Sequence, residues 1–185
     1  MLFGEHLNIE PRDLVTKLVR GVAGCNYGRQ RDRTAAVKEV LRCIGEELGF
    51  CVAPKLRAGQ PEFLYDMVWF KNSDVNDVVM AMESELDKRR EGLLFEDFQK
   101  LLHIKAPLKI FVFQGVEADW TRKIMEGIRK SYLEKFSQHV KGERYIAIEF
   151  LFDENAANWW QLDIPANGPV GSGSFGDRGR IAFPC

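Results

Sequence analysis

Two nearly continuous apolar runs constrain the fold of this chain most. They cover residues 108–113 (LKIFVF) and 145–152 (YIAIEFLF). Runs of this length without polar alternation are typical of strands that are buried on both faces of a sheet. Between them, apolar residues recur at helical spacing over 119–140, the longest such stripe in the chain. The succession of strand, helix and strand predicts an α/β sandwich.

The rest of the chain adds helices and strands to that sandwich. Helical stripes occur at three further places, from Pro11 to Val22, at 34–48 and at 93–103. Strand-like segments occur at 50–56, 63–70 and 78–86. Pro54 interrupts the first of them and places it near an edge of the sheet. Because short connections join these three strands, we expect a meander. The order α-α-β-β-β-α-β-α-β predicts a mixed central sheet.

The composition is that of one globular domain. The 185 residues include 26 Lys and Arg against 27 Asp and Glu, which gives a net charge of −1. We expect one domain over 1–165, with its core at about 33–152, and a Gly/Ser-rich C-terminal tail over 166–185 that contains a short strand at 180–183. The near-neutral charge argues against binding nucleic acid by bulk electrostatics, although it permits a local basic groove.

Several classes of protein are disfavoured by missing motifs. The four cysteines form no Cys-x-x-Cys pair and the three histidines are scattered, so a zinc site is not expected. No secretory signal and no apolar run of about 18 residues are present, which predicts a cytoplasmic protein without membrane contact and with reduced thiols. Residues 171–176 match G-x-G-x-x-G, but the nine residues that follow leave no room for the helix or kinase domain that this motif requires.

Carboxylates interrupt two consecutive strand-like segments. Asp66 lies within FLYDMVWF, and Glu83 and Glu85 lie within VVMAMESEL. The alternation of a strand puts Glu83 and Glu85 on one face, and pairing of the two strands lets Asp66 lie beside Glu83. Converging carboxylates raise one another's pKa unless a cation neutralises them. Oxygen ligands favour Mg²⁺ or Mn²⁺, and such an ion can activate water and stabilise charge on a phosphodiester.

Lys100 stands at the border of the apolar face of the next helix. From there its stem can lie along the sheet while its ammonium reaches the carboxylates, where it would orient water or bind the scissile phosphate. The alternative is a solvated ion pair with Asp97 at i,i+3. The carboxylates also have a structural alternative, since single carboxylates in strands most often face solvent or end a strand.

At these residues the chain resembles the restriction-endonuclease-like superfamily, the PD-(D/E)XK nucleases. The resemblance covers about 33–113, where the order α-β-β-β-α-β is that of the family core. It implies that Asp66 and Glu83 bind the metal ion, that Glu85 occupies the position usually held by lysine, and that Lys100 supplies the lysine from the following helix. It also implies a further metal ligand from the first core helix, for which both Glu46 and Glu47 are candidates.

The resemblance implies a metal-dependent nuclease that uses Mg²⁺ or Mn²⁺, with DNA favoured over RNA as substrate. Catalytic roles would fall to Asp66, Glu83, Glu85 and Lys100, and the ion would be held by Asp66, Glu83 and Glu46. The alternatives are an inactive member of the same fold that binds protein or nucleic acid, and a small oligomeric protein with unrelated chemistry.

Two surface features are candidates for contact with a partner. Lys88, Arg89 and Arg90 follow the strand of Glu83 and could line a local basic groove for a phosphate backbone, although each such cluster could equally be a solvated turn. Trp159 and Trp160 would face opposite sides of a strand. We interpret them as packing residues or as part of a homodimer contact, rather than as platforms for stacked bases.

Overall fold

The computed structural model describes residues 7, 9–25, 30–53, 64–72, 77–87, 91–136, 139, 142–164 and 178–183. Its helices are α1 (Pro11–Ala23), α2 (Gln30–Glu47), α3 (Glu91–His103) and α4 (Ala118–Gly127), and α4 continues into a π-helical segment (Ile128–Leu133). Its strands are β1 (Cys51–Ala53), β2 (Met67–Phe70), β3 (Val78–Glu85), β4 (Leu108–Gln114), β5 (Arg144–Leu151), β6 (Ala156–Asp163) and β7 (Arg178–Ala182). A 3-10 turn (Phe152–Glu154) joins β5 to β6.

The seven strands form one mixed sheet in which spatial order follows chain order from β1 to β7. Strands β1, β2 and β3 pair antiparallel, which confirms the predicted meander. The pairs β3–β4 and β4–β5 are parallel, and β5–β6 and β6–β7 are antiparallel. The two parallel connections advance across the sheet in the same direction, so crossovers of one hand place both of their helices on one face.

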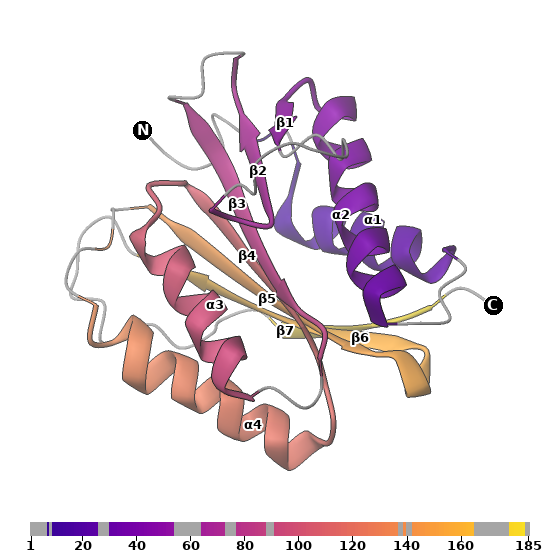
Figure 1. Ribbon diagram of the computed structural model, residues 1–185, viewed down its shortest axis with the longest axis vertical. Coiled ribbons are helices and arrows are strands. Elements are labelled where there is room, and N and C mark those ends of the chain that lie inside the picture. The colour runs from indigo at the N-terminus through magenta and orange to yellow at the C-terminus, as the bar shows by residue number, and fades with distance from the viewer. Residues whose placement is uncertain are drawn as a thin grey trace.

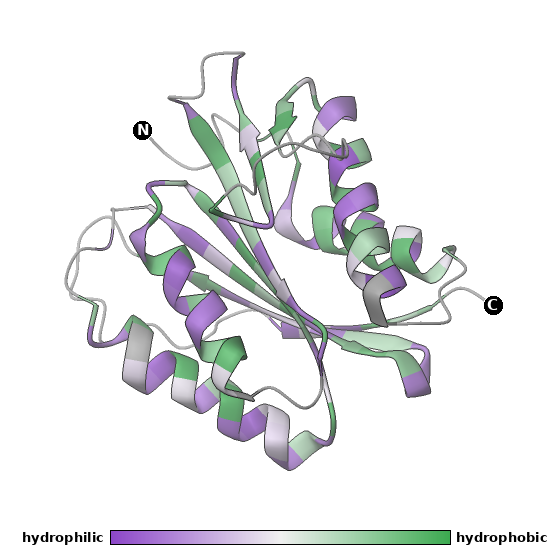
Figure 2. Ribbon diagram, viewed as in Figure 1, coloured by the Kyte–Doolittle hydropathy of each residue, from purple (hydrophilic) through white to green (hydrophobic). Residues whose placement is uncertain are grey.

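Helices cover both faces of the sheet, so the molecule has three layers (Figure 1). Helices α1 and α2 pack on one face, where their apolar residues meet strand side chains such as Met82, Val112 and Ile148. Helices α3 and α4 pack on the other face, against strand side chains such as Phe111 and Ala147. The central strands are mostly apolar, while the helices also carry hydrophilic stretches (Figure 2). This arrangement confirms the predicted α/β class with a mixed sheet.

The helix predicted over 119–140 ends early, at Leu133. His139 lies near that end, with its Nε2 atom 2.9 Å from the carbonyl oxygen of Leu133. It belongs to a buried polar cluster in which the Nζ atom of Lys109 donates to Glu143 at 2.9 Å and to the hydroxyl of Tyr145 at 3.0 Å. Lys109 is 0% exposed. Glu143, which follows the helix in the chain, thus supplies the counter-charge of this buried lysine.

The C-terminal part of the chain contains more sheet than the sequence predicts. Strand β6 was not predicted, because its residues AANWWQLD lack both an apolar run and regular alternation. Pairing with β5 over its whole length forms it. Trp159 and Trp160 face opposite sides of β6, as expected, and both pack in apolar clusters of this chain.

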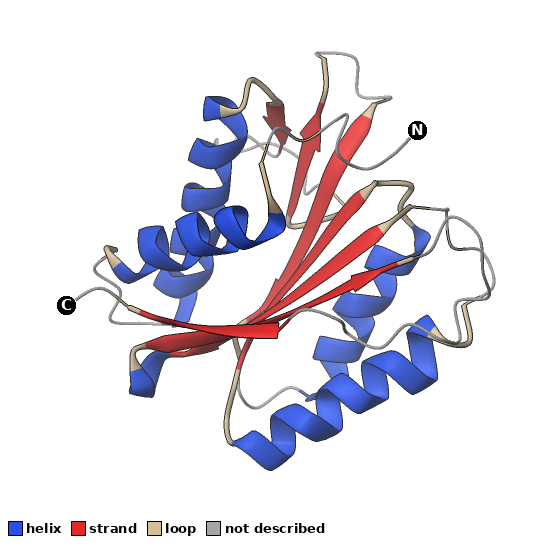
Figure 3. Ribbon diagram, turned by 180° about the vertical axis from the view of Figure 1, so that it is seen from behind, coloured by secondary structure: helices blue, strands red, loops and turns tan. Residues whose placement is uncertain are grey.

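The short strand expected at 180–183 exists as β7, at Arg178–Ala182. It pairs with β6 and so forms part of the sheet. Gly179 lets the backbone of β7 approach the indole of Trp159 closely. Strand β7 forms one edge of the sheet and β1 the other, as the view from behind shows (Figure 3). Residues 165–177, which include the G-x-G-x-x-G match, lie outside the described part of the chain.

No helix in the described ranges has the length and apolar character that crossing a bilayer requires.

Candidate functional site

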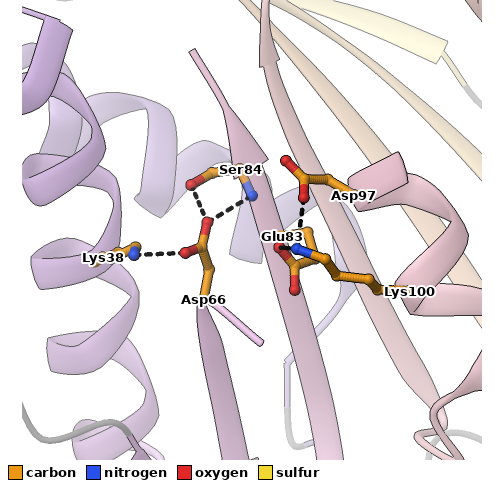
Figure 4. Close-up of polar contacts among 6 residues, drawn as sticks. All are labelled: Lys38, Asp66, Glu83, Ser84, Asp97 and Lys100. Atoms are coloured by element: carbon orange, nitrogen blue, oxygen red, sulfur yellow. Dashed lines mark hydrogen bonds and ion pairs between the residues drawn. The ribbon is translucent and has the colours of Figure 1, made fainter. Parts of the chain in front are cut away.

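A cluster of charged side chains lies where β2 begins and β3 ends. In the antiparallel pair, Val68 is opposite Ala81 and Met67 is opposite Met82. One step further along the same register sets Asp66 opposite Glu83, as the sequence predicts for paired strands. The cluster consists of Lys38 from α2, Asp66, the β3 residues Glu83 and Ser84, and the α3 residues Asp97 and Lys100 (Figure 4).

Asp66 is held by three donors. Its Oδ2 atom accepts hydrogen bonds from the backbone N–H of Ser84 at 2.9 Å and from the Ser84 hydroxyl at 2.6 Å. Its Oδ1 atom pairs with the Nζ atom of Lys38 at 2.6 Å. Because the Asp66 side chain binds the N–H of Ser84, β2 begins only at Met67, later than the predicted start at residue 63. Residues 54–63 lie outside the described part of the chain.

Glu83 is the buried member of the cluster, with 2% of its surface exposed. Its Oε2 atom lies 3.5 Å from the Nζ atom of Lys100. Its Oε1 atom is buried and has no hydrogen-bond partner among the residues that the structure describes. Burial is the main cause that raises the pKa of Glu83 to about 8, the negative charges of Asp66 and Asp97 add to this, and the ammonium of Lys100 opposes it.

Lys100 connects α3 to this carboxyl. Its Nζ atom pairs with Asp97 at 2.6 Å and lies 3.5 Å from Glu83. The two alternatives given for Lys100 from the sequence, contact with the strand carboxylates and an ion pair with Asp97, therefore occur together. Burial opposes the positive charge of Lys100, but the hydrogen bond that it donates to Asp97 and the charges of Glu83 and Asp97 raise its pKa overall. Lys100 therefore remains an ammonium group that points at the carboxyl of Glu83.

Two of the predicted site residues lie apart from these contacts. Glu85 is half-buried on the same face of β3 as Glu83, and its Oε1 atom accepts the backbone N–H of Asp87 at 2.7 Å. Glu46 is exposed and pairs with Arg42 at 2.5 Å. It follows Lys38 by two turns of α2, about 12 Å along the axis. We therefore leave Glu46 out of the candidate ligand set.

The other first-helix candidate, Glu47, is exposed and pairs with Lys17 at 3.4 Å. The basic residues Lys88, Arg89 and Arg90 lie outside the described part of the chain. Of the residues predicted for the site, the structure thus brings together Asp66, Glu83 and Lys100.

Reasoning from the sequence missed two residues of the cluster, Lys38 and Ser84, and one neighbour, Tyr65, as site residues. Lys38 had a detectable signal, since it precedes Leu41 by one turn and so borders the apolar face of α2. The sequence placed Ser84 only on the face of the strand opposite Glu83. Its hydroxyl nevertheless donates to Asp66, which lies just before the start of β2. Tyr65 also belongs here, because burial and the charge of Glu83 raise its pKa.

The charges of the cluster balance when Glu83 keeps its proton. The carboxylates of Asp66 and Asp97 then face the ammonium groups of Lys38 and Lys100. Ionisation of Glu83 adds one buried negative charge whose Oε1 atom lacks a hydrogen-bond partner in the described structure. No group of three or more His, Cys, Asp or Glu side chains in the described ranges is gathered closely enough to hold a metal ion. The residues thus offer a two-carboxyl site flanked by two lysines.

Comparison with models of known protein families finds none that matches this chain. A search of curated protein sequences finds no match either. Any functional conclusion rests on the site itself.

Proposed function

We propose that this chain is a metal-dependent phosphodiesterase of the restriction-endonuclease-like kind, acting on nucleic acid and on DNA in the first place. The observation that carries the proposal is Glu83. This carboxyl is buried opposite Asp66, has an ammonium group beside one oxygen, and has its other oxygen without a hydrogen-bond partner among the described residues. A buried anion of this kind is costly unless a cation or a proton neutralises it.

The order of elements supports the proposal. From α2 to β4 the chain follows the order α-β-β-β-α-β that the resemblance implies. Glu83 lies in β3 and Lys100 lies in α3, in keeping with the resemblance, whereas Asp66 directly precedes β2 rather than lying within it. The cluster also lies at the carboxyl end of β3, within the parallel part of the sheet, and α/β proteins commonly bind ligands at this end.

Each residue then has a chemical role in the proposed reaction. Asp66 and Glu83 would hold Mg²⁺ or Mn²⁺, and the unpartnered oxygen of Glu83 fits a cation. The ion would supply an activated water and stabilise charge on the phosphoryl oxygens. The Lys100 ammonium would orient that water and bind the phosphate whose negative charge grows during attack. Lys38 would keep the carboxylate of Asp66 in place.

A second candidate is an inactive module of the same fold, and one observation favours it. Both oxygens of Asp66 already accept bonds, from Lys38 and from Ser84. With a pKa of about 8, Glu83 is mostly protonated at neutral pH. In this version the cluster is a satisfied polar network that ties α2 and α3 to the sheet, and the ion has no place in it.

Thermal unfolding with Mg²⁺ at two pH values separates the candidates. If the ion replaces the proton of Glu83, Mg²⁺ should raise the melting temperature clearly at pH 8.5 and much less at pH 5.5, because the apparent affinity falls by about tenfold per pH unit below the pKa. Asp66→Asn should abolish the shift, while the exposed control Asp119→Asn on α4 should keep it. An equal shift in Asp66→Asn would place the ion elsewhere.

Cleavage of labelled DNA and RNA with Mg²⁺ or Mn²⁺ completes the test. Wild-type protein should cleave and Glu83→Gln should not. If purified protein cleaves neither substrate at pH 8.5 with either ion, the inactive-module candidate replaces the hydrolase.

A further inference from the structure

A second polar site lies between α1 and the β6–β7 pair, far from the carboxyl cluster. It is a groove with a volume of about 1030 Å³. One wall is the face of α1 that carries Arg12, Thr16 and Arg20, and the floor is formed by β6 and the edge strand β7. Neither the family resemblance nor the carboxyl cluster explains it.

Arginines dominate the lining of this groove. Arg12, Thr16 and Arg20 follow one another at intervals of one helical turn, so the two arginines lie about 12 Å apart along α1. Arg144 lines the groove from β5, and Arg178 and Arg180 line it from β7. By strand alternation, Arg178 and Arg180 project to the side opposite Gly179, so their side chains point away from α1 while their backbone lines the groove.

The acidic residues nearby leave a surplus of positive charge. Five arginines and two acids, Glu10 and Asp163, line the groove. Asp163 is held by a two-pronged ion pair with Arg144, and Arg180 pairs with Glu154 at 2.6 Å.

Arg12 and Arg20 are exposed and form no salt bridge with another described residue. Two guanidinium groups on α1 thus remain available for an anion. The guanidinium group suits phosphate because its donors can bind two oxygens at once.

The floor of the groove depends on a single glycine. A Cβ atom at Gly179 would lie 2.5 Å from the indole nitrogen of Trp159. The absence of a side chain lets β7 lie directly on Trp159, which belongs to the apolar core under α1. The floor is therefore a packed, rigid surface, and rigid surfaces lose little entropy when they order a ligand.

We propose that this groove binds the phosphate backbone of a nucleic-acid strand. The choice of nucleic acid among polyanions rests on the proposed function, whereas the anionic nature of the ligand rests on the arginines alone. An extended ligand is required because Arg12 and Arg20 are about 12 Å apart, more than one phosphate group spans.

The groove would position substrate without touching the reacting bond. Ser84, Val112, Ile148, Trp159 and Gly179 lie in one row across five neighbouring strands. Four interstrand steps of about 4.8 Å put Gly179 about 19 Å from Ser84. Substitutions in the groove should therefore change binding and leave the chemistry at Glu83 unaltered.

The test measures binding of a fluorescent single-stranded DNA 20-mer by anisotropy at several salt concentrations, with Mg²⁺ omitted. The variant Arg12→Gln/Arg20→Gln should raise the Kd at low salt at least about tenfold and reduce the slope of log K against log salt by about 1.4, since each phosphate contact to a single strand contributes about 0.7. The matched control is Arg122→Gln, an exposed arginine of α4 on the opposite face of the sheet. It should leave both quantities unchanged.

A conservative pair distinguishes simple charge from bidentate recognition. Arg12→Lys/Arg20→Lys should restore most of the salt slope because the charge returns, but only part of the affinity. The melting temperatures of all variants should stay near that of wild type, because both arginines are exposed. Circular dichroism on the same samples verifies this.

Each outcome separates this inference from the proposed function. If Glu83→Gln abolishes cleavage but keeps wild-type binding, and the arginine variants lose binding, both stand. If no variant or wild type cleaves but the arginine variants lose binding, the groove stands without the hydrolase. An unchanged Kd and salt slope in Arg12→Gln/Arg20→Gln overturns the groove. Binding of poly-glutamate with equal affinity and equal dependence on these arginines overturns the assignment to nucleic acid.

Discussion

Glu83→Gln should stabilise this protein at alkaline pH, although it removes a charged partner of Lys100. Glutamine copies the shape and neutrality of protonated Glu83. The pKa of Glu83 is about 8 in the folded protein against an ordinary value of 4.5. Between these two values the folded state holds a proton that the unfolded state has released. The stabilisation that this proton provides is complete below pH 4.5 and is lost as the pH rises through 8.

The size of the effect follows from the pKa. Each tenfold change in proton affinity is worth about 1.4 kcal/mol, so the whole difference corresponds to at most about 5 kcal/mol. Between pH 5.5 and 7.5 the wild-type protein should lose about 2 to 3 kcal/mol relative to Glu83→Gln. For a chain of this length, that change lowers the melting temperature by about 5–10 °C.

Urea unfolding of wild type and Glu83→Gln at half-unit steps from pH 5 to 9 measures this difference directly. The control is Glu96→Gln, an exposed change on α3, whose stability should run parallel to that of wild type. In Asp66→Asn the loss of stability should occur at a lower pH than in wild type, because the charge of Asp66 helps to raise the pKa of Glu83. Parallel profiles for wild type and Glu83→Gln across this range would refute the reasoning.

Three further changes test other parts of the structure. Lys100→Ala should reduce nucleic-acid cleavage by about 10²–10³ at saturating Mg²⁺ while the Mg²⁺-dependent melting shift persists; loss of both together would show a structural role. Glu143→Gln should lower the free energy of unfolding by about 3–5 kcal/mol in urea, because it leaves the buried ammonium of Lys109 without its counter-charge. Gly115→Ala should cost about 1–3 kcal/mol in the same assay, because its Cβ would overlap the carboxylate of Glu149; an unchanged midpoint would contradict that packing.

The periodicity of the sequence was enough to predict most of the fold. The central strands β3, β4 and β5 and the helices α2 and α3 lie close to their predicted ranges, because buried strands and amphipathic helices have distinct apolar patterns. Strand β6 has no such pattern and forms through its pairing with β5. The helix after residue 118 ends at Leu133, where His139 joins a polar cluster around Lys109 whose members are distant in the sequence, so apolar periodicity alone does not predict this end.

The candidate site was predictable only where strand alternation determines it. Alternation and pairing place Glu83 opposite Asp66, and helical spacing brings Lys100 to Glu83. Neither rule describes the end of a strand, where the ladder stops and a side chain is free to bind the backbone of its neighbour. Asp66 uses that freedom to accept the N–H of Ser84 and the ammonium of Lys38.

The position of Lys38 changes the chemistry that the carboxyl cluster can support. The resemblance implies an acidic ligand from the first core helix, whereas the α2 side chain that reaches the cluster in this structure is an ammonium group. Lys38 neutralises Asp66, so a cation entering the site finds its full negative charge only after Glu83 ionises. In the proposed function, metal binding would therefore be coupled to loss of the Glu83 proton, and a hydrolase built on this cluster should become active on the alkaline side of neutral pH.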